Sequence, residues 1–377
     1  MSPLISVFVP TKNRYFFLKE LISLVDSYND SRIELVIQDN SDDNSEIVKY
    51  LGGKNFSCVK YFYNNTKLSM SENGNLAFSH CAGEYVCMIG DDDAVCRNIA
   101  DCAQWMKDNK IDALRSAEVQ FIYEGNNDDI LYYEPCSPSY RRLNPVKEIK
   151  KILKNGLVDF GMIAKVYHGI AKRSMLQEFL SLHQKDTIFP GCTPDMSGAI
   201  VTSLASNNYV KLNFPVVLPG LSKMNSGGLS GQILTLDEVP WITQETRNNW
   251  EANIPRIWAR EFIWPESGSK GLRYCGREDL LDRYMNYYMT RCRYILMHKQ
   301  HRSEVISTSP SKLLLYWALF KTIVKVGGRY FLNRKVLARI NHRKNGIYDF
   351  THDCHTVKEA EKYLYEKGYY YNFNQIG

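Results

Sequence analysis

Three consecutive aspartates, Asp91, Asp92 and Asp93, follow a run of mostly apolar residues at 85–89 and a glycine. Neighbouring carboxylates repel one another and are costly to bury, so a positive charge is expected beside them. Oxygen ligands favour hard cations such as Mg²⁺ or Mn²⁺. Because alternate residues of an extended segment point the same way, we expect Asp91 and Asp93 to share one cation and Asp92 to face elsewhere. A solvated turn is the other interpretation of an isolated Asp-Asp-Asp triplet.

The elements that must position these residues alternate between apolar strands and helices. Strands are predicted at 4–10, 33–40, 59–64, 85–90 and near 111–123, and helices at 15–28, 41–51, 70–82 and near 97–109. This order predicts an α/β fold with a mostly parallel sheet and helices on both of its faces. Ligands of such sheets bind beyond the carboxyl ends of the strands. The polar segments 10–14, 38–43 and 90–93 follow three of the strands, so we expect them to converge there.

The segments ISVFVPTKNR, IELVIQDNSDDNS and NGNLAFSHCAGEYVCMIGDDDAV together resemble the inverting family 2 glycosyltransferases, which have the GT-A fold and build bacterial surface polysaccharides. This resemblance covers about the first 95 residues, and FPGCTPD (189–195) is a weaker match. It implies a Rossmann-like nucleotide-sugar-binding and catalytic domain at 1–230. The remainder, 231–377, is predicted to be a largely helical, basic region for acceptor binding, membrane association or both.

The resemblance also implies roles for individual residues. The expected nucleotide-sugar-binding residues are Pro10, Thr11, Asn13, Arg14, Asp39, Asn75, Asp91 and Asp92. Asp93, the last acid of a DXD-type motif, is expected to bind Mn²⁺ or Mg²⁺, which would hold the diphosphate of the donor. A UDP-sugar is the default donor in the family. For Asp39, capping of the helix at 41–51 is a second interpretation.

Displacing a nucleoside diphosphate with inversion requires a base for the acceptor hydroxyl. In relatives this base is a carboxylate roughly a hundred residues after the metal motif, often at the start of a helix. Asp195 in TPDMSGAIVTSL has that setting, although an acid at a helix start is also stabilised by the helix dipole. Glu178 is the alternative base. Lys223, in a Gly/Ser-rich loop, is a candidate for contact with the diphosphate, and a plain linker role is the other interpretation of this loop. His168 is a candidate for contact with the acceptor, and a structural hydrogen-bonding role is the other interpretation of this residue.

Composition indicates a chain without membrane spans. Apolar residues make up 44% and charged residues 23%, which is ordinary for a globular protein. No stretch approaches the roughly 20 apolar residues of a spanning helix. The ten cysteines lack metal-ligand spacing, and Met1 leads almost directly into a strand, so we expect a cytoplasmic protein with reduced thiols.

A basic region lies near the carboxyl end. Between Glu304 and Asp349 there are no acidic residues but nine lysines and arginines. Helical spacing within 311–331 puts Lys321, Thr322, Lys325 and Arg329 on one side and apolar residues on the other. This pattern predicts that 311–344 contacts an anionic membrane surface at the inner face of the cytoplasmic membrane. Packing on the protein itself, with the lysines in solvent, is the other interpretation. Nucleic acid is not expected, because no binding motif occurs.

The residues and the resemblance together predict transfer of a sugar from a nucleoside-diphosphate sugar to a glycan or lipid-linked oligosaccharide. The expected pathway is bacterial O-antigen or capsule synthesis. The alternative is a non-catalytic relative that binds nucleotide or glycan as a scaffold. Turnover of the donor sugar distinguishes the two.

Overall fold

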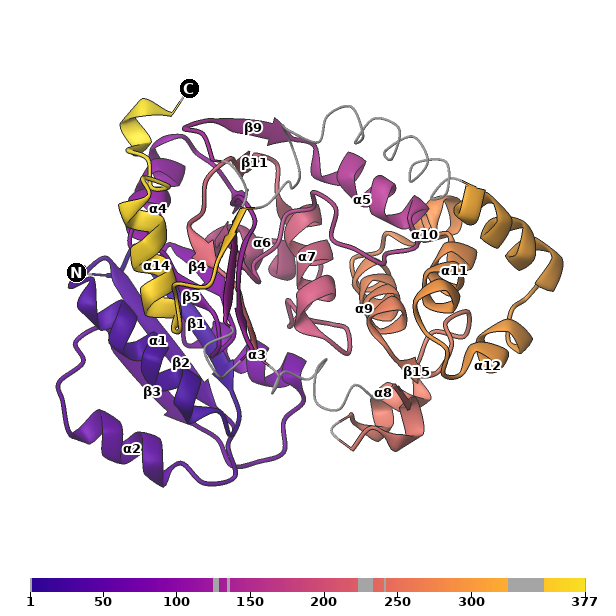
Figure 1. Ribbon diagram of the computed structural model, residues 1–377, viewed down its shortest axis with the longest axis horizontal. Coiled ribbons are helices and arrows are strands. Elements are labelled where there is room, and N and C mark those ends of the chain that lie inside the picture. Colours follow the sequence, from indigo (N-terminus) through magenta and orange to yellow (C-terminus); the bar gives the residue numbers. More distant parts are fainter. Residues whose placement is uncertain are drawn as a thin grey trace.

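The computed structural model describes residues 2–124, 129–133, 136–222, 233–240, 242–324 and 349–376. Its centre is an eight-stranded sheet in the order β3-β2-β1-β4-β10-β6-β11-β9 (Figure 1). The strands are β1 (Ile5–Thr11), β2 (Ile33–Asp39), β3 (Val59–Tyr63), β4 (Tyr85–Met88), β6 (Ala113–Arg115), β9 (Tyr140–Leu143), β10 (Gly169–Lys172) and β11 (Tyr209–Leu212). Strands β3, β2, β1 and β4 are parallel, as are β6 and β11, whereas β10 is antiparallel to both of its neighbours.

Helices cover both faces of this sheet. They are α1 (Tyr15–Ser27), α2 (Ser45–Gly52), α3 (Met70–Ser79), α4 (Ile99–Asp108), α5 (Pro145–Lys154), α6 (Arg173–Leu182) and α7 (Pro194–Ala205). Side chains of β1 alternate between two cores, since Val7 and Val9 pack with α1 and α4 while Phe8 packs with α3, α6 and α7. The predicted fold class, a mostly parallel α/β sheet with helices on both faces, is confirmed.

A second, four-stranded sheet has the order β13-β7-β8-β16. Its strands are β7 (Val119–Tyr123), β8 (Ile130–Tyr133), β13 (Gly220–Ser222) and β16 (Asp349–Thr351), so the strand predicted near 111–123 is two strands, β6 and β7. Helix α14 (Val357–Glu366) follows β16 and lies beside α1 (Figure 1). The buried Glu361 of α14 forms an ion pair of 2.8 Å with Arg97. Residues 349–376 therefore pack with the amino-terminal region in space.

The region from 233 to 324 is largely helical. It contains α8 (Gln244–Asn248), α9 (Arg260–Tyr274), α10 (Glu278–Tyr284), α11 (Tyr287–Met297), α12 (Arg302–Ser307) and a helix at 312–324. Shorter elements of the chain are β5 (Ala94–Val95), β12 (Val217–Leu218), β14 (Leu234–Thr235), β15 (Ile257–Trp258) and the 3₁₀ turns Leu236–Glu238 and Phe373–Gln375. Helix α9 packs against α7, where Gly271 lets Ile200 approach closely. This packing joins the helical region to the sheet.

The helix at 312–324 is attached by a narrow stripe. Leu315 and Thr322 are buried, and Ala318 and Leu319 pack partly against the same core. The prediction that Thr322 lies on an exposed polar face is wrong. The residues that pack against the domain are spaced by three and four along the helix, and Thr322 is one of them. Lys325, Arg329 and the rest of the predicted basic segment up to 344 lie outside the described residues. Among the described residues, no helix combines the length and apolar character needed to cross a bilayer.

Candidate functional site

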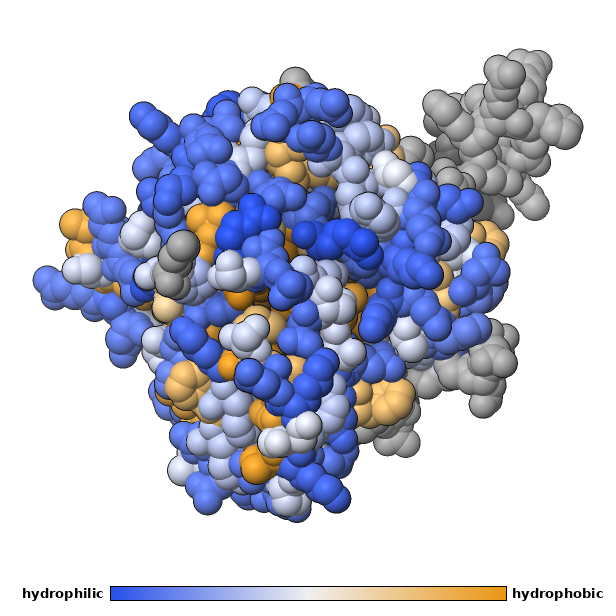
Figure 2. Space-filling view, turned by 90° about the vertical axis from the view of Figure 1, so that its left-hand side faces the viewer, coloured by the Kyte–Doolittle hydropathy of each residue, from blue (hydrophilic) through white to orange (hydrophobic). Residues whose placement is uncertain are grey.

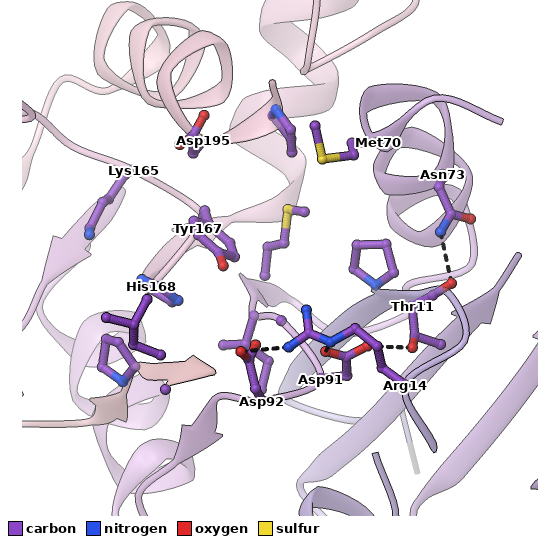
Figure 3. A pocket seen from close by; sticks show the side chains of 18 of the residues that line it. Thr11, Arg14, Met70, Asn73, Asp91, Asp92, Lys165, Tyr167, His168 and Asp195 are labelled. Atoms are coloured by element: carbon purple, nitrogen blue, oxygen red, sulfur yellow. Dashed lines mark hydrogen bonds and ion pairs between the residues drawn. The ribbon is translucent and has the colours of Figure 1, made fainter. Parts of the chain in front are cut away.

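A cleft of about 1580 Å³ lies beyond the carboxyl ends of β1 and β4. Its walls come from the segment after β1, the turn after β4, the segment before β10, and helices α3, α7 and α9. Thr11, Arg14 and Asp91 lie on one side of the pocket, and Lys165 and Asp195 lie on the other (Figure 3). The structure therefore joins the first and third polar segments to the predicted base in one cleft.

Arg14 supplies the positive charge that the acidic turn requires. Its Nη2 atom lies 2.5 Å from Asp92 Oδ2, and its Nε atom lies 3.2 Å from Asp91 Oδ1 (Figure 3). Thr11 Oγ1 donates a hydrogen bond of 2.5 Å to the other oxygen of Asp91. Burial raises the pKa of Asp91 to about 7 against the opposing effect of Arg14, and the neighbouring carboxylates add to the rise. Arg14 is thus the internal counter-ion of two buried acids.

Asp93 has different partners from the other two aspartates. Its Oδ2 atom lies 2.6 Å from His168 Nε2 and accepts a 2.5 Å hydrogen bond from the Gly90 N–H, while Oδ1 accepts one of 2.7 Å from the Gly220 N–H. Burial opposes ionisation, but His168 and these N–H groups hold the pKa of Asp93 below its usual value. The predicted alternation is wrong: residues 91 and 92 form a turn, not an extended segment, so Asp91 and Asp92 share Arg14.

The acidic turn also anchors strand β13. Asp92 Oδ2 accepts hydrogen bonds from the Ser222 hydroxyl (2.7 Å) and N–H (3.2 Å), and Arg14 donates to the same hydroxyl at 2.9 Å. A Cβ atom on Gly220 would stand 1.7 Å from the carbonyl oxygen of Asp92, so only glycine allows this approach. The chain is thereby held at residue 222, and Lys223 lies outside the described residues.

The donor set of the acidic turn fits one type of cation site. Within the described ranges, no group of three or more His, Cys, Asp and Glu residues could hold a metal ion by itself. A Mg²⁺ ion that serves a phosphate ligand usually takes only one or two carboxylates, and phosphate and water supply the other ligands. Asp91 and Asp92 line the cleft, and Asp93 is next to them with 1% of its surface exposed. The cleft-lining carboxylates Asp91 and Asp92 are of the type that can share a cation with a diphosphate, whereas both oxygens of Asp93 are engaged by His168 and backbone N–H groups.

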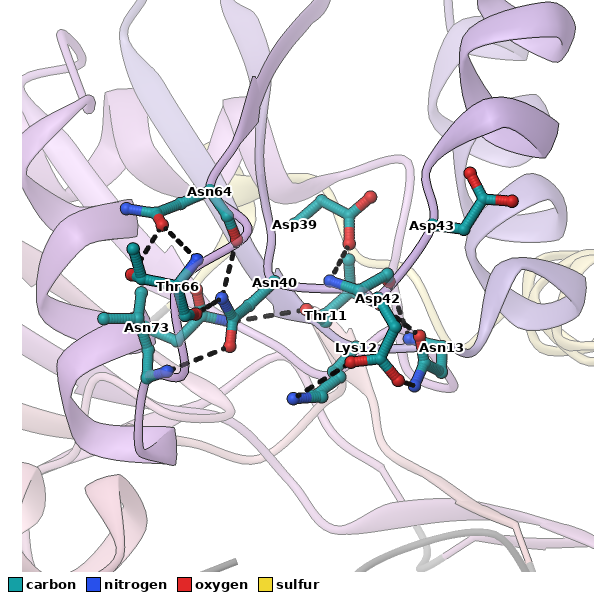
Figure 4. Close-up of polar contacts among 12 residues, drawn as sticks. Thr11, Lys12, Asn13, Asp39, Asn40, Asp42, Asp43, Asn64, Thr66 and Asn73 are labelled. Carbon is teal, nitrogen blue, oxygen red and sulfur yellow. Dashed lines mark hydrogen bonds and ion pairs between the residues drawn. The ribbon is translucent and has the colours of Figure 1, made fainter. Parts of the chain in front are cut away.

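The first two polar segments are tied together at the side of the cleft. Asn13, in the left-handed region at φ 57°, donates through its N–H to Ser41 Oγ (2.7 Å) and through Nδ2 to Asp42 (2.8 Å; Figure 4). Asn13 and Pro10 both line the cleft. The predicted convergence therefore holds for the backbone of these segments.

Two predicted nucleotide contacts are not among the residues that line the cleft. Asp39 is fully buried and accepts hydrogen bonds from the Tyr15 hydroxyl (2.8 Å) and the Tyr61 hydroxyl (2.7 Å). It does not cap α2 either, since the N-cap of that helix is Asn44. Asn75 accepts from the N–H of Ile188 at 3.1 Å. The structure gives both residues contacts within the protein.

Asn73 is a lining residue that sequence reasoning missed. Its Nδ2 atom donates to the carbonyl oxygen of Thr11 at 3.3 Å (Figure 3). A capping box formed by Ser69 and Glu72 starts α3, the helix that carries Asn73. Asn40, another unpredicted residue, holds the loop before α3 through the carbonyl groups of Asn64 and Thr66 (Figure 4). The Ser-x-x-Glu pattern was the available signal.

Asp195 stands in the first turn of α7 and lines the cleft. Its Oδ2 atom accepts a hydrogen bond of 2.7 Å from the Trp264 indole N–H, and Oδ1 accepts one of 2.8 Å from the Met196 N–H. Trp264 lies on α9, and its ring is edge-on to the ring of Phe160, with 4.7 Å between the two ring centres. The helical region thus fixes the orientation of this carboxylate. Glu178, the alternative base, is exposed on α6 and is not among the lining residues.

The segment before β10 adds Lys165, Tyr167 and His168 to the cleft. Because β10 is antiparallel to β4, it begins at the edge where β4 ends. The N–H of His168 donates to the carbonyl oxygen of Met88 at 2.9 Å, which secures this segment beside the acidic turn. The contact predicted between His168 and an acceptor stays a prediction, and its observed partner is Asp93.

The sheet and the cleft at its carboxyl edge define an α/β protein built to bind a ligand beyond its strands. Residues 6–162 match the family model described as "Glycosyl transferase family 2". This range, which is less than half of the chain, is thus similar to the family 2 glycosyltransferases, in agreement with the resemblance predicted from the sequence.

Individual relatives match smaller parts or match less closely. The GalNAc(5)-diNAcBac-PP-undecaprenol beta-1,3-glucosyltransferase of Campylobacter jejuni is 34% identical over 94 residues, which is 24% of this chain and 30% of that protein. Among solved structures, S. aureus TarS 1-349 in complex with UDP-GlcNAc has a TM-score of 0.49 at 15% identity over 81% of each chain. The mannosyltransferase PcManGT from Pyrobaculum calidifontis, with GDP-Man and Mn²⁺, has a TM-score of 0.40 at 13% identity over 82% of this chain and 79% of that one.

Replacing Arg14 by methionine should lower the free energy of unfolding, because the buried carboxylates then lack their counter-ion. Removing one partner of a buried ion pair typically costs about 3–5 kcal/mol, and we expect a loss in this range at pH 7.5. The loss should shrink at pH 5.5, because Asp91, with its raised pKa, then binds a proton. Lys12→Met removes an exposed ion pair of 3.8 Å with Asp42 and should change the free energy of unfolding by less than about 0.5 kcal/mol. Denaturant unfolding of both variants at the two pH values is the measurement, and equal losses in Arg14→Met and Lys12→Met would contradict the counter-ion role.

Proposed function

We propose that this chain is an inverting glycosyltransferase. It moves a sugar from a nucleoside-diphosphate sugar, with UDP as the expected nucleotide, to a glycan or lipid-linked oligosaccharide in bacterial surface-polysaccharide synthesis of the O-antigen or capsule type. Residues 1–230 bind the donor and supply the base, and residues 231–377 contribute to the acceptor side and to membrane association. The protein acts in the cytoplasm, at the inner face of the cytoplasmic membrane.

The observation that supports this proposal best is the division of one cleft into two chemically distinct sides. Thr11, Arg14 and Asp91 lie on one side and Asp195 on the other (Figure 3). Displacement with inversion requires the attacking hydroxyl and the leaving diphosphate to lie on opposite faces of the anomeric carbon. A sugar held between the two sides of this cleft would meet that requirement, with its diphosphate towards the acidic turn.

The chain's own residues then have defined tasks. The acceptor hydroxyl attacks the anomeric carbon, the bond from that carbon to the phosphate oxygen breaks, and the nucleoside diphosphate leaves with the electron pair. Asp195 takes the hydroxyl proton, which its carboxylate can accept while bonded to Trp264, because a carboxylate offers about four acceptor positions. Asp93 and Asp92 would hold Mn²⁺ or Mg²⁺, which supplies charge stabilisation for the leaving diphosphate when bound.

A donor panel tests the function directly. Full-length protein is incubated with UDP-, GDP- and dTDP-sugars, with Mn²⁺ or with EDTA, and release of nucleoside diphosphate is measured. We expect release from one class of donor and loss of that release in EDTA. Nucleotide binding without release from any donor would instead favour a non-catalytic scaffold. Release of pyrophosphate would contradict glycosyl transfer.

The base can be tested separately from donor binding. Asp195→Asn keeps the size of the side chain and an acceptor for the indole N–H but removes the basic carboxylate. General-base assistance is typically worth about 10²–10⁴-fold, so we expect turnover to fall by this factor while calorimetric binding of UDP with Mn²⁺ stays near wild type.

Glu178→Gln is the matched control, since Glu178 is an exposed carboxylate in the neighbouring helix α6. Its turnover should equal that of wild type. Normal turnover in Asp195→Asn would assign the base to another residue, and loss of UDP binding in that variant would assign Asp195 to the donor side.

The helix at 312–324 supports the proposed membrane contact through its apolar side. Its exposed residues include Leu313 (80%), Trp317 (52%), Phe320 (58%) and Ile323 (53%). The rings of Trp317 and Phe320 are stacked, with 5.8 Å between their centres, and Lys321 Nζ lies 4.8 Å from the centre of the Trp317 ring. In contrast, the face of the molecule seen in Figure 2 is mostly hydrophilic, with apolar residues in small, scattered groups.

The expected occupant of this helix side is an anionic lipid surface. Aromatic and aliphatic side chains enter the boundary of a bilayer, and neighbouring lysines and arginines are attracted by the anionic headgroups. The acid-free sequence between Glu304 and Asp349, with its nine lysines and arginines, matches that charge.

Phe320→Ser should weaken binding of the full-length protein to vesicles of phosphatidylglycerol and phosphatidylcholine. The loss of one buried aromatic ring predicts a fall of about tenfold or more, since burying such a side chain contributes roughly 1.5–3 kcal/mol. Phe350→Ser is the matched control, because Phe350 is 61% exposed on β16. Vesicle co-sedimentation measures both variants. Equal binding by Phe320→Ser and wild type would contradict membrane contact through this helix.

A further inference from the structure

The Asp195 side of the cleft contains a cluster of cations and aromatic rings that the proposed reaction does not use. Arg115, Lys165 and Arg260 line this part of the cleft together with Phe160 and Trp264. We call these five residues the acceptor-side cluster. Arg115 comes from β6, Phe160 and Lys165 from the segment between α5 and β10, and Arg260 and Trp264 from α9, so the cluster exists only in the folded chain.

Lys165 is the central member of this cluster. Its ammonium group lies 5.4 Å from the centre of the Phe160 ring and, within the described residues, has no carboxylate within ion-pair distance. Burial lowers the pKa of Lys165 to about 7, and the neighbouring charge of Arg115 lowers it further. A half-buried ammonium beside a second cation is unfavourable for the protein alone. Such a placement is typical of a position that receives an anion.

Two arginines extend the positive charge. Arg115 is 5% exposed; its Nη1 donates to the Gly161 carbonyl at 2.7 Å, its Nη2 forms an ion pair with Glu118, which also lines the cleft, and its buried Nε has no hydrogen-bond partner. Arg260 has its guanidinium 5.4 Å from the Trp264 ring centre, and its side chain is 51% exposed. Arg115 and Lys165 both line the cleft, and the ammonium of Lys165 is the group of this cluster that is best placed to receive oxygen atoms of a ligand.

We infer that the acceptor bears an anionic group, a carboxylate or a phosphate, which Lys165 and Arg115 bind beside Asp195 while Arg260 and the two aromatic rings border the adjoining sugar. This inference rests on the proposed glycosyltransferase function and names the chemical class of its acceptor. The diphosphate of the donor is placed elsewhere, because the acidic turn and Arg14 lie on the opposite side of the pocket (Figure 3). An anion at Lys165 also leaves Asp195 next to a hydroxyl of the same or the neighbouring sugar.

The test uses three small probes with the full-length protein: glucose, glucuronate and glucose 1-phosphate. Each is titrated calorimetrically into protein saturated with UDP and Mn²⁺, at low salt. We expect at least one anionic probe to bind about tenfold more tightly than glucose, which corresponds to one charge-assisted contact. A preference for glucuronate indicates an acidic sugar as the source of the anion, and one for glucose 1-phosphate indicates a phosphate-bearing acceptor.

Matched variants locate the effect. Lys165→Gln should lose the preference for the anionic probe, and Arg260→Gln, on the exposed side of the cluster, should reduce it. Lys154→Gln is the control, because Lys154 Nζ makes the same kind of contact, 5.4 Å from the Tyr284 ring, away from the cleft. Equal binding of glucose and both anions, or an unchanged preference in Lys165→Gln, would overturn the inference.

Two further outcomes separate this inference from the proposed function. UDP and Mn²⁺ are titrated first, without any probe. Binding of UDP without an anion preference overturns the acceptor class and leaves the transferase function in place. Absence of binding of UDP, GDP and dTDP alike overturns the function, and with it the assignment of the cluster to an acceptor. A preference for the anionic probe that appears only in protein without UDP would place the cluster in the donor site and contradict the inference.

Discussion

The burial of three carboxylates at the end of β4 is the constraint on which the rest of this site depends. Asp91 and Asp92 are stable there because Arg14 returns from the segment after β1 to neutralise them. Asp93 is stable because His168 and two backbone N–H groups surround it. Charges removed from water must be paired and hydrogen-bonded, so each of these partners is held in place by the same requirement.

This requirement connects parts of the chain that are far apart in sequence. The turn after β4 holds the segment after β1, the segment before β10 and strand β13 around a single point. Ser222 is bonded to both Asp92 and Arg14, so the end of β13 is held directly beside the acids. The second side of the cleft has a separate support, in which Trp264 of α9 binds Asp195 of α7. The two supports give the cleft an acidic, internally neutralised side and a basic, aromatic side.

Local patterns were sufficient to predict much of the fold. The order of strands and helices through α4 follows from apolar spacing and cap residues within each short segment, and the positions of Thr11 and Arg14 at the cleft follow from that order, whereas Asp195 was identified from the family resemblance. The side-chain directions of the acidic triplet did not, because alternation applies to extended backbone and residues 91 and 92 form a turn. The role of Asp39 could not be predicted from local patterns either. Its carboxylate accepts hydrogen bonds from two tyrosine hydroxyls, of α1 and β3, which are distant from it in sequence.

The positions of the remaining cleft residues depend on contacts between distant elements. Lys165 and His168 reach the cleft because β10 inserts antiparallel between β4 and β6, which a strand-helix alternation does not indicate. Trp264 reaches Asp195 through the packing of α9 on α7, across 69 positions of sequence. The exposed apolar side of the helix at 312–324 likewise depends on which residues of the helix pack against the domain. Helical spacing alone assigned Thr322 to the wrong side.

The central claim is that the segment after β1, the acidic turn and strand β13 form one nucleotide site around Arg14. Hydrogen–deuterium exchange of the full-length protein, with and without UDP and Mn²⁺, tests this claim most directly. The account predicts that amides at 11–14, 90–93 and 220–222 gain protection together at the same concentration of UDP. Protection confined to one of these segments, or protection only at regions remote from the cleft, would contradict it.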